Sequence, residues 1–139
     1  MPFYLLMVLI IWCMVMSIRT IFIEEKSKKK FSMENLIWIA NLYATILIGF
    51  ALIYLLFELN HYVVILDSGM RIESNFFQQL ETSFYFSAMT MFSVGYGDVS
   101  PVGIGRIIAA IEAFIGYSLP AAFLIRAVID FEQHERRDV

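Results

Sequence analysis

Residues 90–101 read TMFSVGYGDVSP in a chain that is otherwise strongly apolar. Gly95 and Gly97 stand on either side of Tyr96, with little charge around them. Glycine commonly marks a turn, and a structural turn is one interpretation of the segment. The other is a loop whose own backbone carbonyls act as ligands. Aiming successive carbonyls at one axis needs positive φ angles, which Gly95 and Gly97 can adopt without strain.

The composition is that of a membrane protein. Of the 139 residues, 60% are hydrophobic and 17% are charged, whereas soluble domains have about 45–50% apolar and about 25% charged residues. The length predicts one domain. The lysines form one short run and no basic face recurs, so nucleic acid is not an expected partner. Cys13 is the only cysteine, which excludes an intrachain disulfide and a cysteine-based zinc cluster.

Three segments are long enough to cross a bilayer, whose core about 30 Å thick needs roughly 20 apolar residues in a helix. They are residues 1–18, 36–57 and 107–125, and the last contains Glu112. Residues 76–92 are also aromatic and apolar, but they are shorter and contain several polar side chains. That segment is predicted to enter the membrane without crossing it.

The positive charges set the expected orientation, because loops rich in lysine and arginine remain in the cytoplasm. Residues 24–31, with the run KSKKK, and the tail from residue 130 are therefore expected inside. The acidic loop 58–75 is expected outside, which places the N-terminus outside and the C-terminus in the cytoplasm. Positive charge follows the first helix and does not precede it, so the helix is read as a retained span and not as a secretory signal. The lysine run is either a solvated loop or, in addition, a contact for lipid headgroups.

Residues 75–101 must then leave the outer surface and return to it, with the glycine turn on the return. Backbone carbonyls that converge on one axis can replace the water around a dehydrated cation. Val94 and Tyr96 are expected to point outward and hold the loop open, while Ser93 adds a hydroxyl ligand at the inner end. A helix running inward from residue 76 aims its partly negative C-terminus at a cation below the loop. The segment therefore predicts a cation site built from backbone.

The sequence SVGYGD of residues 93–98 resembles the selectivity filter of potassium channels, whose common form is TVGYG followed by aspartate. Further matches at the end of the pore helix and the opening of the inner helix are Thr90, Pro101, Gly105 and Arg106. The resemblance covers about residues 35–137. It implies an all-α integral membrane protein with the pore fold of prokaryotic two-helix channels, plus an additional N-terminal transmembrane helix.

The same resemblance implies how the chain is divided. The expected parts are an N-terminal transmembrane helix at 1–23, a basic cytoplasmic loop at 24–34, a pore domain at 35–130 and a cytoplasmic tail at 131–139. Within the pore domain they are an outer helix at 35–57, an extracellular turret at 58–75, a pore helix at 76–92, a filter at 93–98 and an inner helix at 102–130. One filter strand cannot surround an ion, so the expected partners are three further copies of the chain around an axis, together with the lipid bilayer. The implied location is a bacterial plasma membrane, crossed several times.

Individual roles also follow from the resemblance. The residues whose carbonyls would line the stacked potassium sites are Ser93, Val94, Gly95 and Tyr96. The implied supporting residues are Gly97 and Asp98 at the outer mouth, Met89 and Thr90 at the end of the pore helix, and Tyr85 and Phe86 as an aromatic cuff beside Tyr96. In the inner helix, Gly116 stands at the position of a hinge glycine, and the residues that would face the cavity are Tyr117, Pro120 and Leu124.

The chain departs from the family pattern at two positions near the filter. Ser93 replaces threonine, which keeps the hydroxyl but loses the methyl group that fixes its rotamer; a looser innermost site is expected. Some family members place a glutamate at the position of Met89, where it pairs with the aspartate after the filter. Asp98 therefore lacks that partner, and Tyr85 is the candidate replacement. The alternative is that Met89 simply packs.

Two residues of the third span carry open alternatives. An acid in a membrane helix usually faces protein or a cavity, so Glu112 is expected either behind the pore helix as a buried acid or near the outer interface in contact with water. Pro120, four residues after Gly116, lacks a helix hydrogen-bond donor and favours a bend near a gate. The alternative is a proline that the membrane helix tolerates. The additional first helix either braces the pore or binds a partner.

The expected function is passive, selective conduction of potassium ions, with no organic cofactor. The alternatives are a weakly selective cation channel and a non-conducting accessory subunit. The sequence has no recognisable catalytic triad, metal cluster or phosphate loop, so no enzymatic activity is expected. No arginine ladder indicates a voltage sensor, and no ligand-sensing domain is expected after residue 130. The gating stimulus is therefore expected from the pore, the membrane or a separate regulatory subunit.

Overall fold

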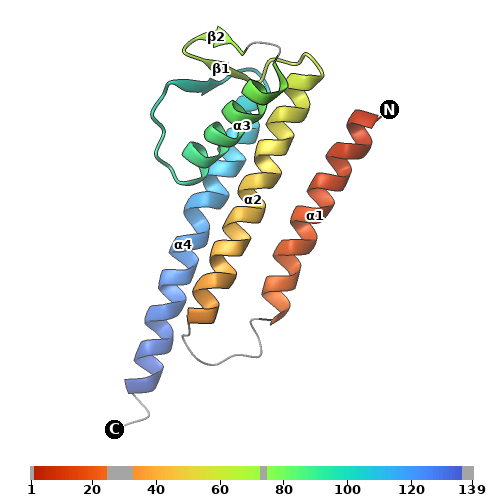
Figure 1. Cartoon of the computed structure of the whole chain (residues 1–139). Coiled ribbons are helices and arrows are strands. Elements are labelled where there is room, and N and C mark those ends of the chain that lie inside the picture. The colour runs from red at the N-terminus through yellow and green to blue at the C-terminus, as the bar shows by residue number, and fades with distance from the viewer. Residues whose placement is uncertain (1, 25–32, 73–74, 136–139) are drawn as a thin grey trace.

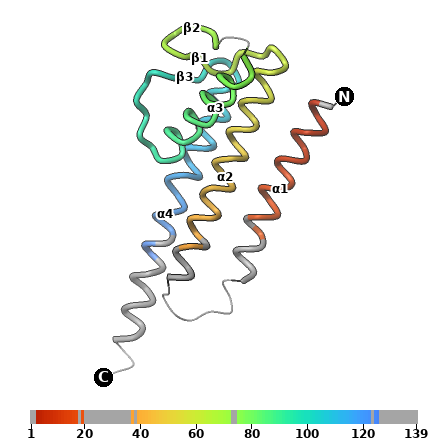
Figure 2. The backbone as a smooth tube through the Cα atoms, viewed as in Figure 1, coloured from red at the N-terminus to blue at the C-terminus, as the bar shows by residue number. Residues whose placement is uncertain are grey.

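The structure, a computed structural model, describes residues 2–24, 33–72 and 75–135. The helices in these residues are α1 (Pro2–Glu24), α2 (Met33–Leu59), α3 (Phe76–Met91) and α4 (Gly105–Glu135). The short α3 lies against α2 and α4 at one end of the molecule (Figure 1). In the tube view α2 runs between α1 and α4 (Figure 2). The chain is therefore mostly helical, as the long apolar segments and the resemblance to channels predict.

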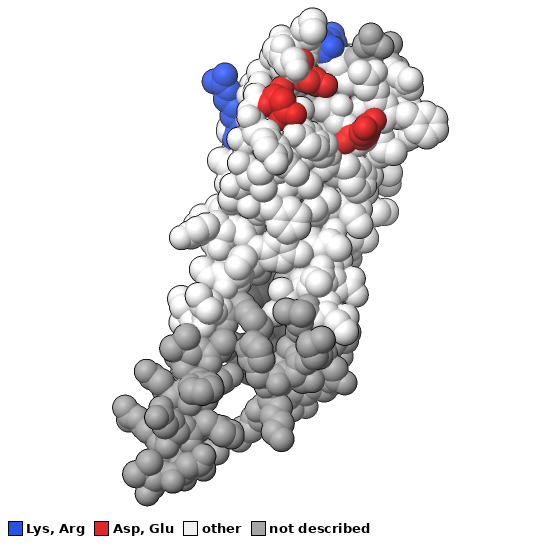
Figure 3. Space-filling model, turned by 60° about the vertical axis from the view of Figure 1, so that its left-hand side comes forward, with Lys and Arg blue, Asp and Glu red and all other residues white. Residues whose placement is uncertain are grey.

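Among the described residues, Ile39–Leu59 in α2 is the segment long and apolar enough to cross a membrane, and Phe3–Ser17 in α1 is a shorter apolar helix. On the face shown in Figure 3, charged side chains lie at the end that carries α3, and the surface below them is uncharged down to the residues that are not described. An uncharged band under a charged cap is the distribution expected of a protein that sits in lipid.

The core lies where α2 and α3 meet α4. Tyr54 of α2 and Met91 of α3 are buried there. The ring of Phe86 packs edge-on against that of Tyr54, with centroids 5.0 Å apart. Phe86 is thus buried between helices, whereas the side chain of Tyr96 is 74% exposed in the single chain. Tyr85 and Phe86 are consecutive on a helix, so their side chains point about 100° apart.

The expectation of an all-α chain misses a small antiparallel sheet. It consists of β1 (Ile65–Asp67), β2 (Met70–Arg71) and β3 (Val99–Pro101) in the order β2-β1-β3. Leu66 pairs with Ser100, so the strand that follows the glycine turn is bonded to the loop between α2 and α3. The backbone groups of β3 need hydrogen-bond partners once that segment is buried, and β1 supplies them.

The helix bounds differ slightly from those expected. α2 begins at Met33, α3 ends at Met91, and α4 begins at Gly105 and runs to Glu135 with Pro120 inside it. Pro101 lies in β3, which is why the inner helix starts later than residue 102. The lysine run and the expected cytoplasmic residues Arg136 and Arg137 lie outside the described part of the chain.

Candidate ion-conduction site

The glycine turn begins by folding back on the last turn of α3. The amide of Ser93 donates to the carbonyl of Thr90 at 3.1 Å. The amides of Val94 and Gly95 both donate to the carbonyl of Met89, at 2.9 and 3.3 Å. The backbone of Met89 and Thr90 therefore fixes the inner end of the turn. The sequence indicates a role only for the Met89 side chain, whereas the structure shows that its carbonyl supports the turn.

Backbone conformation alternates along the turn. The φ angles of Ser93, Gly95 and Gly97 are 56°, 55° and 84°, whereas Val94 and Tyr96 between them do not have positive φ. A Cβ atom at Gly95 or Gly97 would meet nothing within 4 Å, so the reason for glycine is the φ angle and not a lack of space. Ser93 shares the conformation without being glycine, which is uncommon and costs on the order of 1 kcal/mol. The alternation was expected at the glycines and not at Ser93.

The outer end of the turn is held from two sides. The Tyr85 hydroxyl donates to the Asp98 carboxylate at 2.7 Å. The Asp98 carbonyl accepts from the amide of Ser68 at 2.7 Å, which joins it to the tip of the β1–β2 hairpin. The hydrogen bond from Tyr85 is the main cause that lowers the pKa of Asp98. The expected replacement partner of Asp98 is thus present.

Glu112 lies behind α3 and is fully buried, which is the first of the two placements considered for it. Its carboxyl group accepts a hydrogen bond from Tyr54 of α2 at 2.8 Å. A second hydrogen bond, at 2.5 Å, joins it to the hydroxyl of Ser87 on α3. Glu112 therefore links three helices behind the turn. Tyr54 and Ser87 were missed, because one hydroxyl among many apolar residues gives no sequence signal of its partner.

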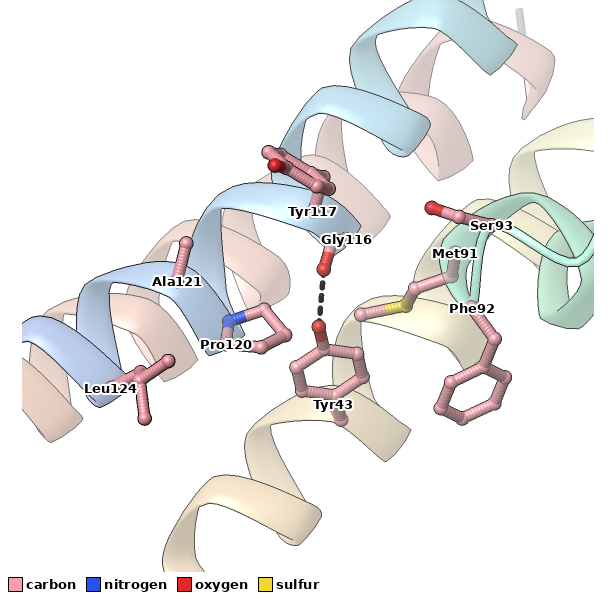
Figure 4. A pocket seen from close by; sticks show the side chains of 9 residues that line it. All are labelled: Tyr43, Met91, Phe92, Ser93, Gly116, Tyr117, Pro120, Ala121 and Leu124. Atoms are coloured by element: carbon pink, nitrogen blue, oxygen red, sulfur yellow. Dashed lines mark hydrogen bonds between the residues drawn. The ribbon is translucent and has the colours of Figure 1, made fainter.

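Below the turn is a hollow of about 380 Å³. The residues around it come from the end of α3 and the start of the turn, from α4 and from α2: Met91, Phe92, Ser93, Gly116, Tyr117, Pro120, Ala121, Leu124 and Tyr43. Figure 4 shows Ser93 and Tyr117 on the same side of this space, with Pro120 and Tyr43 facing each other across its lower part. The residues expected in a cavity, Tyr117, Pro120 and Leu124, all line it.

At Gly116 the helix α4 comes very near the end of α3. A Cβ atom at this position would lie 2.2 Å from the Met91 carbonyl oxygen, which is far inside a normal contact. The carbonyl of Gly116 in turn accepts a hydrogen bond from the Tyr43 hydroxyl of α2. Gly116 therefore has a packing function that its expected role as a hinge did not include, and Tyr43 is a site residue that the sequence did not reveal.

The comparisons with known proteins agree with this geometry. Residues 42–133 match the family described as ion channel. The chain belongs to the ion channel family. The channel is 38% identical over 110 residues to protein LctB of Bacillus caldotenax, covering 79% of this chain and 82% of that protein. It is 43% identical over 104 residues to protein LctB of Geobacillus stearothermophilus, covering 75% of this chain and 78% of that protein. No solved structure matches the channel.

The family match shows which part of the channel carries the shared fold. The matched range starts in α2, includes α3 and the glycine turn, and ends in α4. It contains every residue of the site described above, Tyr43 included. α1 lies outside this range and packs on α2, where the side chain of Met14 fills the space over Gly49.

Proposed function

We propose that this channel conducts potassium ions passively and selectively, through a filter made by residues 93–97. The observation that carries the proposal is the alternation of positive φ at Ser93, Gly95 and Gly97 with ordinary φ at Val94 and Tyr96. Alternating backbone of this kind can turn successive carbonyls toward one side, where they replace the hydration shell of a cation. The ions are cargo, and no organic cofactor takes part.

The filter residues support assembly around an axis. Residues 92–98 are all exposed in the single chain, although Val94 and Tyr96 are large and apolar. α4 adds an exposed apolar face at helical spacing, formed by Ile107, Ile111 and Phe114. One strand of carbonyls cannot enclose an ion, and a closed ring of four copies would both complete the ion sites and cover these surfaces.

Each end of the filter then has a chemical role. At the inner end, the Ser93 hydroxyl adds a ligand where the turn opens into the hollow below. At the outer end, Asp98 is ionised at neutral pH, as an aspartate usually is, and the mouth therefore attracts cations; the hydrogen bond from Tyr85 lowers the pKa of Asp98 further. The β1–β2 hairpin, whose Ser68 amide bonds to the Asp98 carbonyl, lies at the same end of the molecule as the start of α1 (Figure 1). This arrangement fits a multi-pass protein of a bacterial plasma membrane whose outer side carries the hairpin.

Flux from reconstituted vesicles tests the proposal. The purified channel is placed in vesicles, and uptake is measured with either potassium or sodium as the permeant cation. We expect potassium flux that clearly exceeds sodium flux, because the filter carbonyls replace the hydration shell of potassium. Equal fluxes would indicate the weakly selective cation channel. No flux from an intact tetramer would indicate the accessory subunit.

Two matched variants locate the flux in the filter. Gly95→Ala places a side chain where φ is 55°, and Gly69→Ala does the same at φ 76° in the β1–β2 hairpin. Both substitutions strain one left-handed residue, and neither added Cβ meets an atom within 4 Å. Loss of flux in Gly95→Ala with retention in Gly69→Ala is expected. Equal losses would mean that the filter conformation is not what carries the ions.

A further inference from the structure

Pro120 leaves one backbone carbonyl of α4 without its usual partner. In an α-helix the amide of each residue donates to the carbonyl four residues before it. Proline has no amide hydrogen, so the carbonyl of Gly116 cannot receive that bond. α4 nevertheless continues as a helix through both residues, from Gly105 to Glu135. In a membrane, where water is scarce, such a carbonyl needs another donor.

Tyr43 of α2 is that donor. Its hydroxyl bonds to the Gly116 carbonyl, and Figure 4 shows the ring rising from α2 directly beneath this oxygen, next to the ring of Pro120. The hydroxyl thus replaces, from a neighbouring helix, the bond that Pro120 cannot make. Tyr43, Gly116 and Pro120 act together as one structural unit.

The same unit contacts the base of the filter. The ring of Tyr43 stacks on that of Phe92, with centroids 5.9 Å apart and planes 15° apart. Phe92 directly precedes Ser93. On the other side, Gly116 lies so close to the Met91 carbonyl that no side chain fits between them. A bend of α4 at Gly116 would therefore disturb the inner end of the filter as well as the helix.

We propose that Tyr43 is a positioning residue for gating: its hydroxyl holds the Gly116–Pro120 turn of α4 in the conformation seen here, and α4 bends at this turn only when the bond is released. A glycine followed four residues later by a proline weakens α4 locally, since glycine has high backbone freedom and proline cannot donate the helical hydrogen bond. The Tyr43 hydroxyl compensates for this weakness without a covalent link. The inference rests on the proposed conduction for its readout.

A double-mutant cycle tests the unit. Tyr43→Phe removes the hydroxyl and keeps the ring on Phe92. Pro120→Ala returns an amide that can donate to Gly116, which makes the hydroxyl dispensable; Pro120 is exposed, so alanine is tolerated there. The four proteins are reconstituted, and the ratio of open to closed time is measured in single channels. Tyr62→Phe, at an exposed tyrosine outside the site, is the control for loss of a hydroxyl.

We expect Tyr43→Phe to change the ratio of open to closed time by on the order of tenfold, within the range of hydrogen bonds between membrane helices. In the Pro120→Ala background the same substitution should change it by less than about twofold. Equal effects in the two backgrounds would overturn the proposal, because Tyr43 would then act by packing alone. An unchanged ratio in Tyr43→Phe would overturn it as well.

The same cycle can be followed by the unfolding temperature of the detergent-solubilised protein, which does not depend on conduction. If Tyr43→Phe lowers the unfolding temperature when Pro120 is present, and not in the Pro120→Ala background, the bond is supported even if the wild-type protein passes no ions. In that case the proposed potassium conduction fails, and the gating role of Tyr43 fails with it. If the wild type conducts potassium but neither measurement shows coupling between Tyr43 and Pro120, the gating role of Tyr43 is rejected and the proposed conduction stands.

Discussion

The Tyr85 hydroxyl lies 2.7 Å from the Asp98 carboxylate, and this hydrogen bond joins the middle of α3 to the outer end of the glycine turn. On another face of α3, the Ser87 hydroxyl bonds to Glu112 of α4. Each of these two faces of α3 is therefore held by a hydrogen bond between a hydroxyl of α3 and an acidic side chain elsewhere in the chain. Met89, two residues after Ser87 on α3, contributes its carbonyl and not an acidic side chain.

Removal of the Tyr85 hydroxyl should destabilise the conducting conformation of the filter. In Tyr85→Phe the Asp98 carboxylate loses its side-chain donor and keeps its backbone contact with Val99. We expect conduction that starts normally and then declines several-fold faster than in the wild type under steady potassium. Patch recordings measure the decline. An identical time course in the two proteins would show that Ser68 and the sheet hold Asp98 without help from Tyr85.

The pH dependence of conduction should identify the same contact. The pKa of Asp98 is lower in the folded protein than in the unfolded chain. Ionised Asp98 therefore stabilises the folded state fully above its unfolded pKa of about 3.9. This stabilisation is lost as the pH falls through the pKa of the folded protein. Conduction by the wild type should therefore persist when the external pH drops slightly below about 3.9. In Tyr85→Phe the acidic midpoint should move upward. A midpoint that does not move would show that Tyr85 does not set the pKa.

Ser93→Thr tests the innermost ion site. Threonine keeps the hydroxyl but is β-branched, and a β-branched residue resists the positive φ of 56° found at this position. We expect a shift in the affinity for potassium of less than about tenfold, with selectivity over sodium retained, because the carbonyl ligands are unchanged. Barium block measures occupancy of this site. A larger shift would mean that the Ser93 conformation, and not its hydroxyl, controls the inner site.

Much of this arrangement follows from the sequence. The apolar segments, the short helix before Met91 and the alternation around Tyr96 are local features, and each leaves a signal in composition or spacing. The Tyr85–Asp98 bond was also accessible, because the missing acid at Met89 raised the question of its replacement. The hydrogen bonds from Ser68 of the hairpin to Asp98 and from Tyr43 to Gly116 could not be predicted from the sequence. Those contacts join residues 30 or 73 positions apart in the sequence, and a single hydroxyl does not identify its partner.

Gly116→Ala should weaken the contact between α4 and the filter base. The added methyl group would lie 2.2 Å from the Met91 carbonyl oxygen, which is backbone and cannot rotate away. We expect a loss of about 1–3 kcal/mol in the free energy of unfolding, typical of overpacking. Thermal unfolding in detergent measures it, with Ser118→Ala in the same helix as control. An unfolding temperature equal to that of the control would show that α4 can move away from Met91 at little cost.

Glu112 should carry a proton at neutral pH. The Ser87 oxygen lies within hydrogen-bond distance of two acceptors, the Leu47 carbonyl at 2.9 Å and a Glu112 oxygen at 2.5 Å, but a hydroxyl has one hydrogen to give. If Ser87 donates to Leu47, its bond to Glu112 needs a hydrogen on the carboxyl group. That assignment satisfies all three groups and leaves no unpaired charge in a fully buried site.

Infrared difference spectra of the wild type and Glu112→Gln should then show the band of a protonated carboxyl group at neutral pH, absent from the variant. Glutamine can donate to Ser87 and accept from Tyr54, so Glu112→Gln should conduct like the wild type. Glu112→Ala removes both bonds and should lose about 3–5 kcal/mol of stability, as large-to-small changes and broken buried networks do. A carboxylate band in place of the protonated one would mean that α3 is held by a buried charge, and Glu112→Gln would then alter conduction.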